Sequence, residues 1–377
     1  AILDLAWMDY KGEAIPEHDY TKARKGFEAV LNHGKASQSQ KVTARAQLLW
    51  MKYALQGFIN PYPRAYKELE KLLKSSHLLP ETRSNIYLCL ALISKEEKNF
   101  KDAKMKIEMA VEAAVDSDTK LACQFKAAQL AYKQFDNLNY EEILTRFKAI
   151  SDCWSVEYRR YVIQSRGHLV GLYQLAHNSR SNIMIFQEVR RYCALIIDDP
   201  IFMSTKDNEL LALRSKAQAR LALMNFKGLG LDRPNFKDAF EGFQKVCNNS
   251  FSSNLSKAQA YYCIAYMNLF GKGAELNRMK AKIGFQLVLN FPDLPSDLQA
   301  DAHYWLGFMT YKKMETFLGD PSARTRFESV IKLAPKNSLW ANAHYILGEM
   351  DFKKGRDERD PEAMKEARQH FILARPC

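Results

Sequence analysis

Apolar positions recur at helical spacing from one end of the chain to the other. An aromatic residue is followed three positions later by a small or apolar residue, and then by apolar residues four and seven positions beyond that one. Spacings of 3, 7 and 10 place all four residues on one face of an α-helix. The clearest copies are Tyr20/Ala23/Phe27/Val30, Tyr62/Ala65/Leu69/Leu72, Phe100/Ala103/Ile107/Ala110, Tyr140/Ile143/Phe147/Ile150 and Phe236/Ala239/Phe243/Val246.

We term the second position of this pattern the anchor. Weaker copies centre on Ile185, Ala281, Ala323 and Ala367, which gives nine anchors at 23, 65, 103, 143, 185, 239, 281, 323 and 367. Their separations are 42, 38, 40, 42, 54, 42, 42 and 44 residues. A spacing this regular predicts a repeat protein in which each anchor lies on the second helix of a helix pair, helix B.

A second pattern lies about fifteen residues before most anchors and marks the first helix of each pair, helix A. It places a Met between small or apolar residues and an aromatic residue, in LAWMDY (5–10), LLWMKY (48–53), LALMNF (221–226), IAYMNL (264–269), LGFMTY (306–311) and LGEMDF (347–352). Six of the 13 Met residues therefore share one register. A Met stripe at helical spacing is typical of core packing.

These two helices cannot bury their apolar faces alone, so neighbouring pairs must stack. We predict an all-α fold, an α–α superhelix that forms a right-handed solenoid of about nine antiparallel helix pairs. The longest apolar run, residues 86–93, is too short for a membrane span, which needs about 20 residues. The 54-residue step divides the prediction into N-terminal repeats at 1–197, an irregular insertion at 198–209 and C-terminal repeats at 210–377.

The best copy of both patterns, ARLALMNFKGLGLDRPNFKDAFEGFQKV (219–246), combines a Met-centred helix A, a Gly-x-Gly turn at Gly228 and Gly230, and Ala239 with Phe243 on helix B. Residues 5–31 are nearly as good a copy. The chain thus resembles the Sel-one-like branch of the tetratricopeptide-repeat superfamily over almost its whole length. It departs from that family directly after the Met, where the usual tyrosine is replaced, for example by Asp9, Asn225 or Asp351.

The resemblance implies a non-enzymatic interaction scaffold or adaptor that binds a protein or peptide partner on a concave face lined by helices A, alone or within a larger assembly. Aromatic residues at three helix-A positions around the Met are then the expected contacts. These candidates are Trp7, Tyr10, Trp50, Tyr53, Tyr262, Tyr266, Tyr304, Phe308, Tyr311 and Tyr345. Tyr262, Tyr304 and Tyr345 are separated by 42 and 41 residues, so we expect them to form a ladder along the superhelix.

The charge of the chain leaves a second interpretation open. Lys and Arg number 55 against 43 Asp and Glu, a net charge of +12, and residues 143–192 are the most basic part. A basic face with interleaved aromatic residues is also typical of a protein that binds nucleic acid or an anionic membrane surface. Its candidate residues are Arg146, Lys148, Arg159, Arg160, Arg166, Arg190 and Arg191.

Candidate chemistry is sparse. The Gly-x-Gly turns lack the strand of a phosphate loop, no His pair has metal spacing on one helix, and no catalytic motif is present, so we expect no enzymatic activity, cofactor or metal. A catalytic part outside this segment is the remaining alternative. The seven cysteines form no CxxC pair, which favours a reduced protein in the cytoplasm, although a signal peptide removed before Ala1 would imply export. Because repeat one begins inside its helix A, we expect native residues before Ala1.

Overall fold

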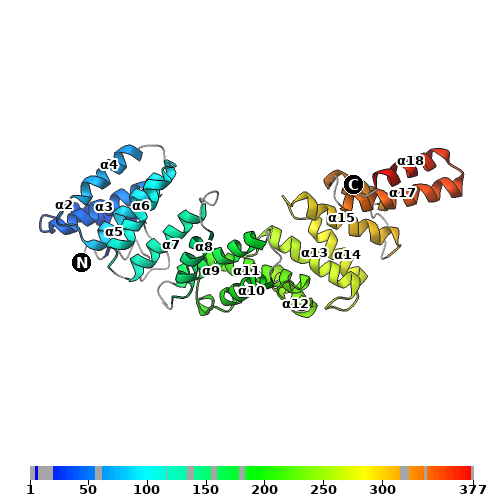
Figure 1. Cartoon of the computed structure of the whole chain (residues 1–377), viewed down its shortest axis with the longest axis horizontal. Helices are drawn as coiled ribbons and strands as arrows, with labels where there is room; N and C mark the ends of the chain where they lie inside the picture. The colour runs from blue at the N-terminus through cyan, green and yellow to red at the C-terminus, as the bar shows by residue number, and fades with distance from the viewer. Residues whose placement is uncertain are drawn as a thin grey trace. The chain divides into compact units, whose positions relative to one another are not determined.

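A computed structural model describes residues 5–6, 20–55, 62–115, 117–133, 140–153, 159–177, 183–314, 322–334 and 338–374. Within these ranges every regular element is helical, with seventeen α-helices and one 3₁₀ helix (Figure 1). The all-α prediction is confirmed. The chain divides into two compact units, Ala1–Ser165 and Arg166–Cys377, and the division falls inside helix α9.

The first unit contains seven complete described helices and the start of α9. They are α2 (Tyr20–Asn32), α3 (Gln38–Leu55), α4 (Tyr62–Leu73), α5 (Pro80–Glu96), α6 (Phe100–Ala113), α7 (Ser117–Lys133), α8 (Tyr140–Ser151) and then α9 (Arg159–His177).

The second unit continues from α9 to the end of the chain. Its helices are α10 (Ile183–Ile197), the 3₁₀ helix η1 (Pro200–Met203), α11 (Asn208–Lys227), α12 (Phe236–Asn248), α13 (Asn254–Phe270), α14 (Arg278–Leu289), α15 (Ser296–Tyr311), α16 (Ala323–Leu333), α17 (Ser338–Glu358) and α18 (Pro361–Leu373).

Consecutive helices pack as pairs, in the order that the two sequence patterns predict. The most extensive contacts join helix A to helix B of one repeat, as in α5 with α6, α11 with α12, α13 with α14, α15 with α16, and α17 with α18. Helix B then contacts helix A of the next repeat, as α12 does with α13. Eight pairs run from α3/α4 to α17/α18, and α2 packs against the preceding segment at Ala6. The helical-repeat fold is therefore confirmed.

Seven of the nine predicted anchors lie in the core of these pairs, and the side chain of an eighth, Ala65, lies outside the described part. Ala23, Ala103, Ala239 and Ala281 are completely buried, and Ile143, Ala323 and Ala367 are at most 7% exposed. Alanine at this position lets helix B approach helix A closely, and the aromatic residue four positions later fills the space between repeats, as Phe243 and Phe285 do.

Repeat five corrects one anchor. Ile185 is half-exposed, whereas Val189, Cys193 and Ile196 of α10 are buried. The same spacing therefore fits Phe186/Val189/Cys193/Ile196, and the anchor is Val189. The register is supported by Gly230 of repeat six, where a Cβ would lie 3.0 Å from Phe186 Cβ of the preceding repeat. In the same way, a Cβ on Gly273 of repeat seven would crowd Phe236 of the repeat before it. The step of 54 residues thus becomes one of 50, preceded by one of 46.

The Met slot and the glycines beside it explain how tightly the helices pack. Met51, Met224, Met267 and Met309 are buried, and Met350 is half-buried, so the core interpretation of this slot is confirmed. Two residues before Met224, Met267, Met309 and Met350 lies an alanine or a glycine that meets helix B. Cβ atoms added at Gly242 and Gly284 would lie only 2.8 Å from the Cβ atoms of Ala222 and Ala265. A larger residue on either side would separate the two helices.

Residues 198–209 connect α10 to α11 through the short helix η1. The Asp199 side chain accepts from the backbone N–H of Ile201 and also pairs with Arg166 of α9, at 3.0 Å from the guanidinium. Asp207 then caps α11 by accepting from the N–H groups of Glu209 and Leu210. The helices on either side of the segment, α10 and α11, contact each other. Its role as an irregular insertion between two arrays stays a prediction.

Candidate functional site

Aromatic side chains gather where helices A of repeats six to eight end. Phe226 of α11 contacts Tyr266 of α13 with ring centroids 5.7 Å apart, Tyr266 contacts Trp305 of α15 at 5.5 Å, and Trp305 contacts Phe308 at 5.8 Å. Phe270 packs between Tyr266 and Trp305, at 4.7 and 5.3 Å. We call these five residues the aromatic row. The rings meet mostly edge to face, the arrangement that aromatic pairs prefer.

The row is only partly covered by protein. Phe226, Tyr266, Trp305 and Phe308 are half-buried, and Phe270 is 42% exposed. The rings join neighbouring helices A, because Phe226 of α11 contacts Tyr266 of α13, and Tyr266 contacts Trp305 of α15. Helices A thus present a continuous aromatic surface within the second unit.

Two lysines lie over these rings. Lys272 stands between Gly271 and Gly273, and its Nζ is 5.3 Å from the Tyr266 centroid, 5.4 Å from that of Phe236 and 6.0 Å from that of Phe270. Lys312 follows α15, with Nζ 5.9 Å from the Phe308 centroid and 5.1 Å from that of Tyr311. At such distances an ammonium group is attracted to the negative face of an aromatic ring.

The three ladder tyrosines differ in their surroundings. Tyr262 is half-buried and its hydroxyl oxygen accepts a hydrogen bond from the Trp305 indole, while burial and nearby Asp301 raise its pKa. Tyr304 is half-buried against Phe308 and Phe327, and burial raises its pKa as well. Tyr262 therefore joins repeat seven to repeat eight, whereas the ring contacts of Tyr304 lie within repeat eight.

Tyr345 on α17 is the exposed member of the ladder. Its side chain is 51% exposed, its ring lies 5.9 Å from Phe371, and the carboxylate of Glu349 raises its pKa. The Tyr311 hydroxyl donates to the same carboxylate at 3.4 Å. Glu349 thus links the end of α15 in repeat eight to α17 in repeat nine.

Four predicted contact residues cannot be placed on this surface. Trp7 and Tyr10 lie outside the described residues. Trp50 and Tyr53 belong to α3, but their side chains are outside the described part. Their role stays a prediction.

Phe270, Trp305 and Lys272 belong to the surface but were not among the candidates from sequence. Phe270 comes three residues after its Met rather than two, and Trp305 precedes its Met by four residues. The signal that could have found Trp305 is its spacing of three to Phe308, which places both rings on one helical face. Lys272 gives no signal beyond its position inside a Gly-x-Gly turn.

The basic candidates do not share one environment. Arg166 is buried, where its guanidinium pairs with Asp199 and donates to the carbonyl of Leu195 at 3.1 Å. Arg166 therefore holds α9 to α10 and is not part of an exposed surface.

The remaining basic candidates are divided between the two units. Arg190 is half-buried, and burial lowers its pKa, while Arg191 is exposed and pairs with Glu188 at 3.3 Å. Arg146, Lys148 and Arg159 are half-buried and Arg160 is exposed, all four in the first unit. A basic surface over 143–192 stays a prediction.

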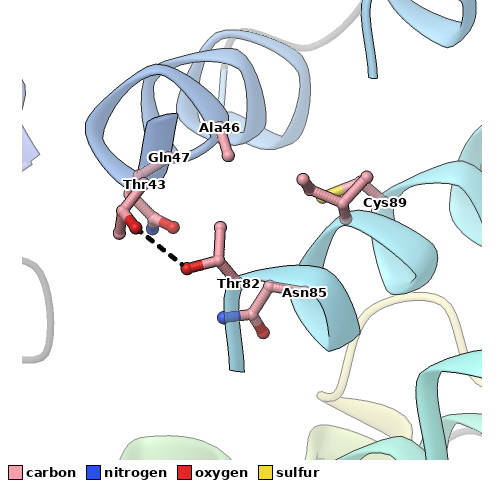
Figure 2. Close-up of a pocket in the computed structure, with 7 residues that line it drawn as sticks. Thr43, Ala46, Gln47, Thr82, Asn85 and Cys89 are labelled. Carbon is pink, nitrogen blue, oxygen red and sulfur yellow. Dashed lines mark hydrogen bonds between the residues drawn. The ribbon is translucent and has the colours of Figure 1, made fainter. Parts of the chain in front are cut away.

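A small pocket lies between α3 and α5 in the first unit (Figure 2). Thr43, Ala46 and Gln47 line it from α3, and Thr82, Asn85, Ile86 and Cys89 line it from α5. The Thr43 and Thr82 hydroxyls are hydrogen-bonded at 3.1 Å. The pocket contains no acid or base, and burial raises the pKa of the Cys89 thiol, which keeps it in the unreactive protonated form.

The recurring histidines of helix A contact helix B of their own repeat. Arg326 donates to His303 Nδ1 at 3.2 Å, and His344 Nδ1 lies 2.7 Å from His370 Nδ1. Asp351, which is buried, accepts from Arg324 and lies 3.7 Å from His370 Nε2. Among the described residues no group of three His, Cys, Asp or Glu could hold a metal ion, and no disulfide joins the described cysteines. No helix in these ranges is long and apolar enough to cross a bilayer.

Comparisons with known proteins find no matching family model and no matching curated protein. Solved structures do match. A Sel1 repeat protein from Oxalobacter formigenes shares 15% identity over 74% of this chain and 98% of its own, with a TM-score of 0.42. The apo form of the quorum sensor NprR from B. thuringiensis shares 13% identity over 99% of this chain and 98% of its own, with a TM-score of 0.46.

A third structure, an IFIT1 monomeric mutant with Gppp-AAAA, shares 14% identity over 98% of this chain and 79% of its own, with a TM-score of 0.38. The chain is thus similar to solved helical-repeat proteins of the Sel1 and tetratricopeptide type. At these scores the similarity concerns the fold alone.

Proposed function

We propose that this chain is a non-enzymatic protein-interaction scaffold whose helix-A surface in repeats six to nine binds a protein or peptide partner. The observation that carries the proposal is the aromatic row, five rings in mutual contact that remain partly exposed across three helices A. Rings held by their neighbours lose little freedom when a partner covers them, and aromatic residues dominate binding hot spots.

The fold supports an extended interface rather than a single small site. Helix pairs that stack along a repeat array place equivalent positions side by side, which suits a long partner segment. Tyr345 and Phe352, 51% and 45% exposed on α17, extend the same helix-A surface beyond the row into repeat nine.

Peptide display against the full chain, followed by affinity measurement of the selected peptides, tests this proposal. Phe270→Ala and Tyr345→Ala each remove an exposed ring of the surface, and we expect binding to weaken about tenfold or more, as for an interface hot spot. The matched control is Ile283→Ala, which removes a 47% exposed side chain from α14, a helix B.

The two outcomes are distinct. If Ile283→Ala weakens binding while both aromatic variants bind like the parent chain, the partner uses helices B and the proposal is wrong. Thermal unfolding of each variant shows whether the fold is retained, which we expect because all three side chains are exposed.

A further inference from the structure

The unit that carries the aromatic row is strongly basic. Residues 166–377 contain 30 Lys and Arg against 22 Asp and Glu, a net charge of +8. A positive potential attracts negatively charged partners and repels basic ones. The overall charge therefore already favours an acidic partner, and two lysines bring positive charge onto the row itself.

The Gly-x-Gly turn of repeat seven fixes the first of these charges. Gly271 and Gly273 have φ values of +65° and +69°, a conformation that other residues rarely adopt. Gly273 also packs so closely on Phe236 that a Cβ would lie 2.4 Å from the Phe236 carbonyl carbon. This geometry positions the backbone of Lys272, and the Lys272 ammonium lies over three rings.

The second charge lies at the other end of the row. Lys312 follows the last residue of α15, and its ammonium lies over Phe308 and Tyr311. Among the described residues, neither Lys272 nor Lys312 forms an ion pair with a carboxylate. The nearby carboxylate of Glu349 accepts a hydrogen bond from the Tyr311 hydroxyl.

We infer that the aromatic row binds an acidic protein segment, whose apolar side chains pack on the rings and whose carboxylates pair with Lys272 and Lys312. This inference rests on the proposed function and adds the chemistry of the partner. Ammonium groups already positioned by rings lose less side-chain entropy on pairing than mobile surface lysines do. They also place charge at fixed points along the segment, which selects acidic sequences over basic ones.

The ring packing argues against single-stranded nucleic acid at this surface. Bases bind proteins by stacking on open ring faces. Trp305 is instead surrounded by Tyr266, Phe270, Phe285, Tyr304 and Phe308, and Tyr266 and Phe270 are covered by Lys272.

Fluorescence anisotropy with the full chain tests the inference. Three labelled peptides of equal length share the same Phe and Leu positions. Their remaining positions are Asp/Glu in the acidic peptide, Ser/Gln in the neutral one and Lys/Arg in the basic one. An oligouridylate serves as a fourth probe. We expect the acidic peptide to bind tightest. The double variant Lys272→Met/Lys312→Met keeps apolar contact with the rings and should weaken binding of the acidic peptide about three- to tenfold, with little effect on the neutral one. Lys280→Met, which changes an exposed lysine of α14, is the matched control.

Each result supports or overturns a separate step. If the neutral peptide binds as tightly as the acidic one, or the double variant has no effect, the inference fails but the scaffold proposal stands. Tightest binding of the oligouridylate, lost in the double variant, would also overturn it in favour of nucleic acid. The location of the bound peptide is determined by ¹⁹F NMR of the chain labelled with fluorotryptophan. The Trp305 signal is assigned as the one that the variant Trp305→Phe lacks. If a bound peptide leaves that signal unchanged, the aromatic row is not the site and the proposed function fails with the inference.

Discussion

The indole N–H of Trp305 on α15 donates a hydrogen bond to the hydroxyl oxygen of Tyr262 on α13, over 3.1 Å. The two residues belong to helices A of neighbouring repeats, 43 positions apart. The repeat pattern predicts Tyr262 as a contact residue. In the structure its hydroxyl instead binds Trp305, the central ring of the aromatic row. The Tyr262 hydroxyl thus helps to fix the orientation of the Trp305 ring.

This hydrogen bond predicts that Tyr262→Phe lowers the free energy of unfolding by about 1 kcal/mol, the usual net value of one hydrogen bond. The ring packing is kept, so only the hydroxyl is lost. Urea denaturation measures the change. Tyr345→Phe, at an exposed position, should stay within about 0.5 kcal/mol of the parent chain. Equal losses in both variants would mean that the Tyr262 hydroxyl has no special role.

The close approach of α14 to α13 predicts an inverted response to a helix-stabilising change. Gly→Ala inside a helix ordinarily stabilises it by about 1 kcal/mol. At Gly284 the new Cβ would lie 2.8 Å from Ala265 Cβ, so we expect Gly284→Ala to destabilise the fold by about 1–3 kcal/mol. Gly34→Ala, in the turn after α2, controls for the added methyl group, because nothing lies within 4 Å of its Cβ position. A higher melting temperature for Gly284→Ala would contradict the close packing.

The pair formed by Arg166 and Asp199 predicts a strongly non-additive response. Asp199→Leu leaves the buried Arg166 guanidinium without its carboxylate, which should cost about 3–5 kcal/mol of stability. Adding Arg166→Met should recover much of that loss, because two apolar residues can replace a buried ion pair. A double-mutant cycle by denaturation gives the coupling, and additive effects would show that the pair is not coupled.

The histidine in repeat eight predicts acid sensitivity. Burial, with the positive charge of Arg326 nearby, lowers the pKa of His303 to about 4. The folded state therefore favours neutral His303, whereas the unfolded chain has a His pKa of about 6.5. The stability that His303 contributes is complete above about pH 6.5 and is lost as the pH falls towards 4.

We expect His303→Gln to lose less melting temperature over that acid range than the parent chain does. His77→Gln, at an exposed position, should behave like the parent. Asp301 acts in the opposite direction, because burial and Asp297 raise its pKa to about 6. The comparison is therefore made between variants at each pH. Identical acid profiles for His303→Gln and the parent would contradict the shift.

The repeat architecture could be predicted because it depends on spacing. Ala23, Ala239 and Ala281 are buried where the period places them, since a small residue recurs wherever two helices approach closely. Among the anchors whose side chains the structure describes, the misplaced one, Ile185, lies in an apolar stretch, IMIFQEV, that offers more than one register. The burial of Val189, Cys193 and Ile196 in the folded chain selects the correct one.

The surface was harder to predict, because exposure is not a property of a repeat position. Tyr262, Tyr304 and Tyr345 are equivalent in sequence, yet Tyr345 is exposed while the first two are half-buried. The sequence predicts Arg166 as part of a basic patch, because its partner Asp199 lies 33 residues away and no sequence pattern links the two. Long-range partners of this kind become visible only in the folded chain.

Site-specific photocrosslinking tests the central claim most directly. The photoreactive amino acid p-benzoylphenylalanine replaces Phe270 or Tyr345 on helices A, or Ile283 or Leu287 on helix B of repeat seven, all four at exposed positions. The full chain is then irradiated with its selected peptide ligand. We predict crosslinks at Phe270 and Tyr345 and none at Ile283 and Leu287. Crosslinks at Ile283 and Leu287 with none at Phe270 and Tyr345 would contradict the proposal that helices A form the binding surface.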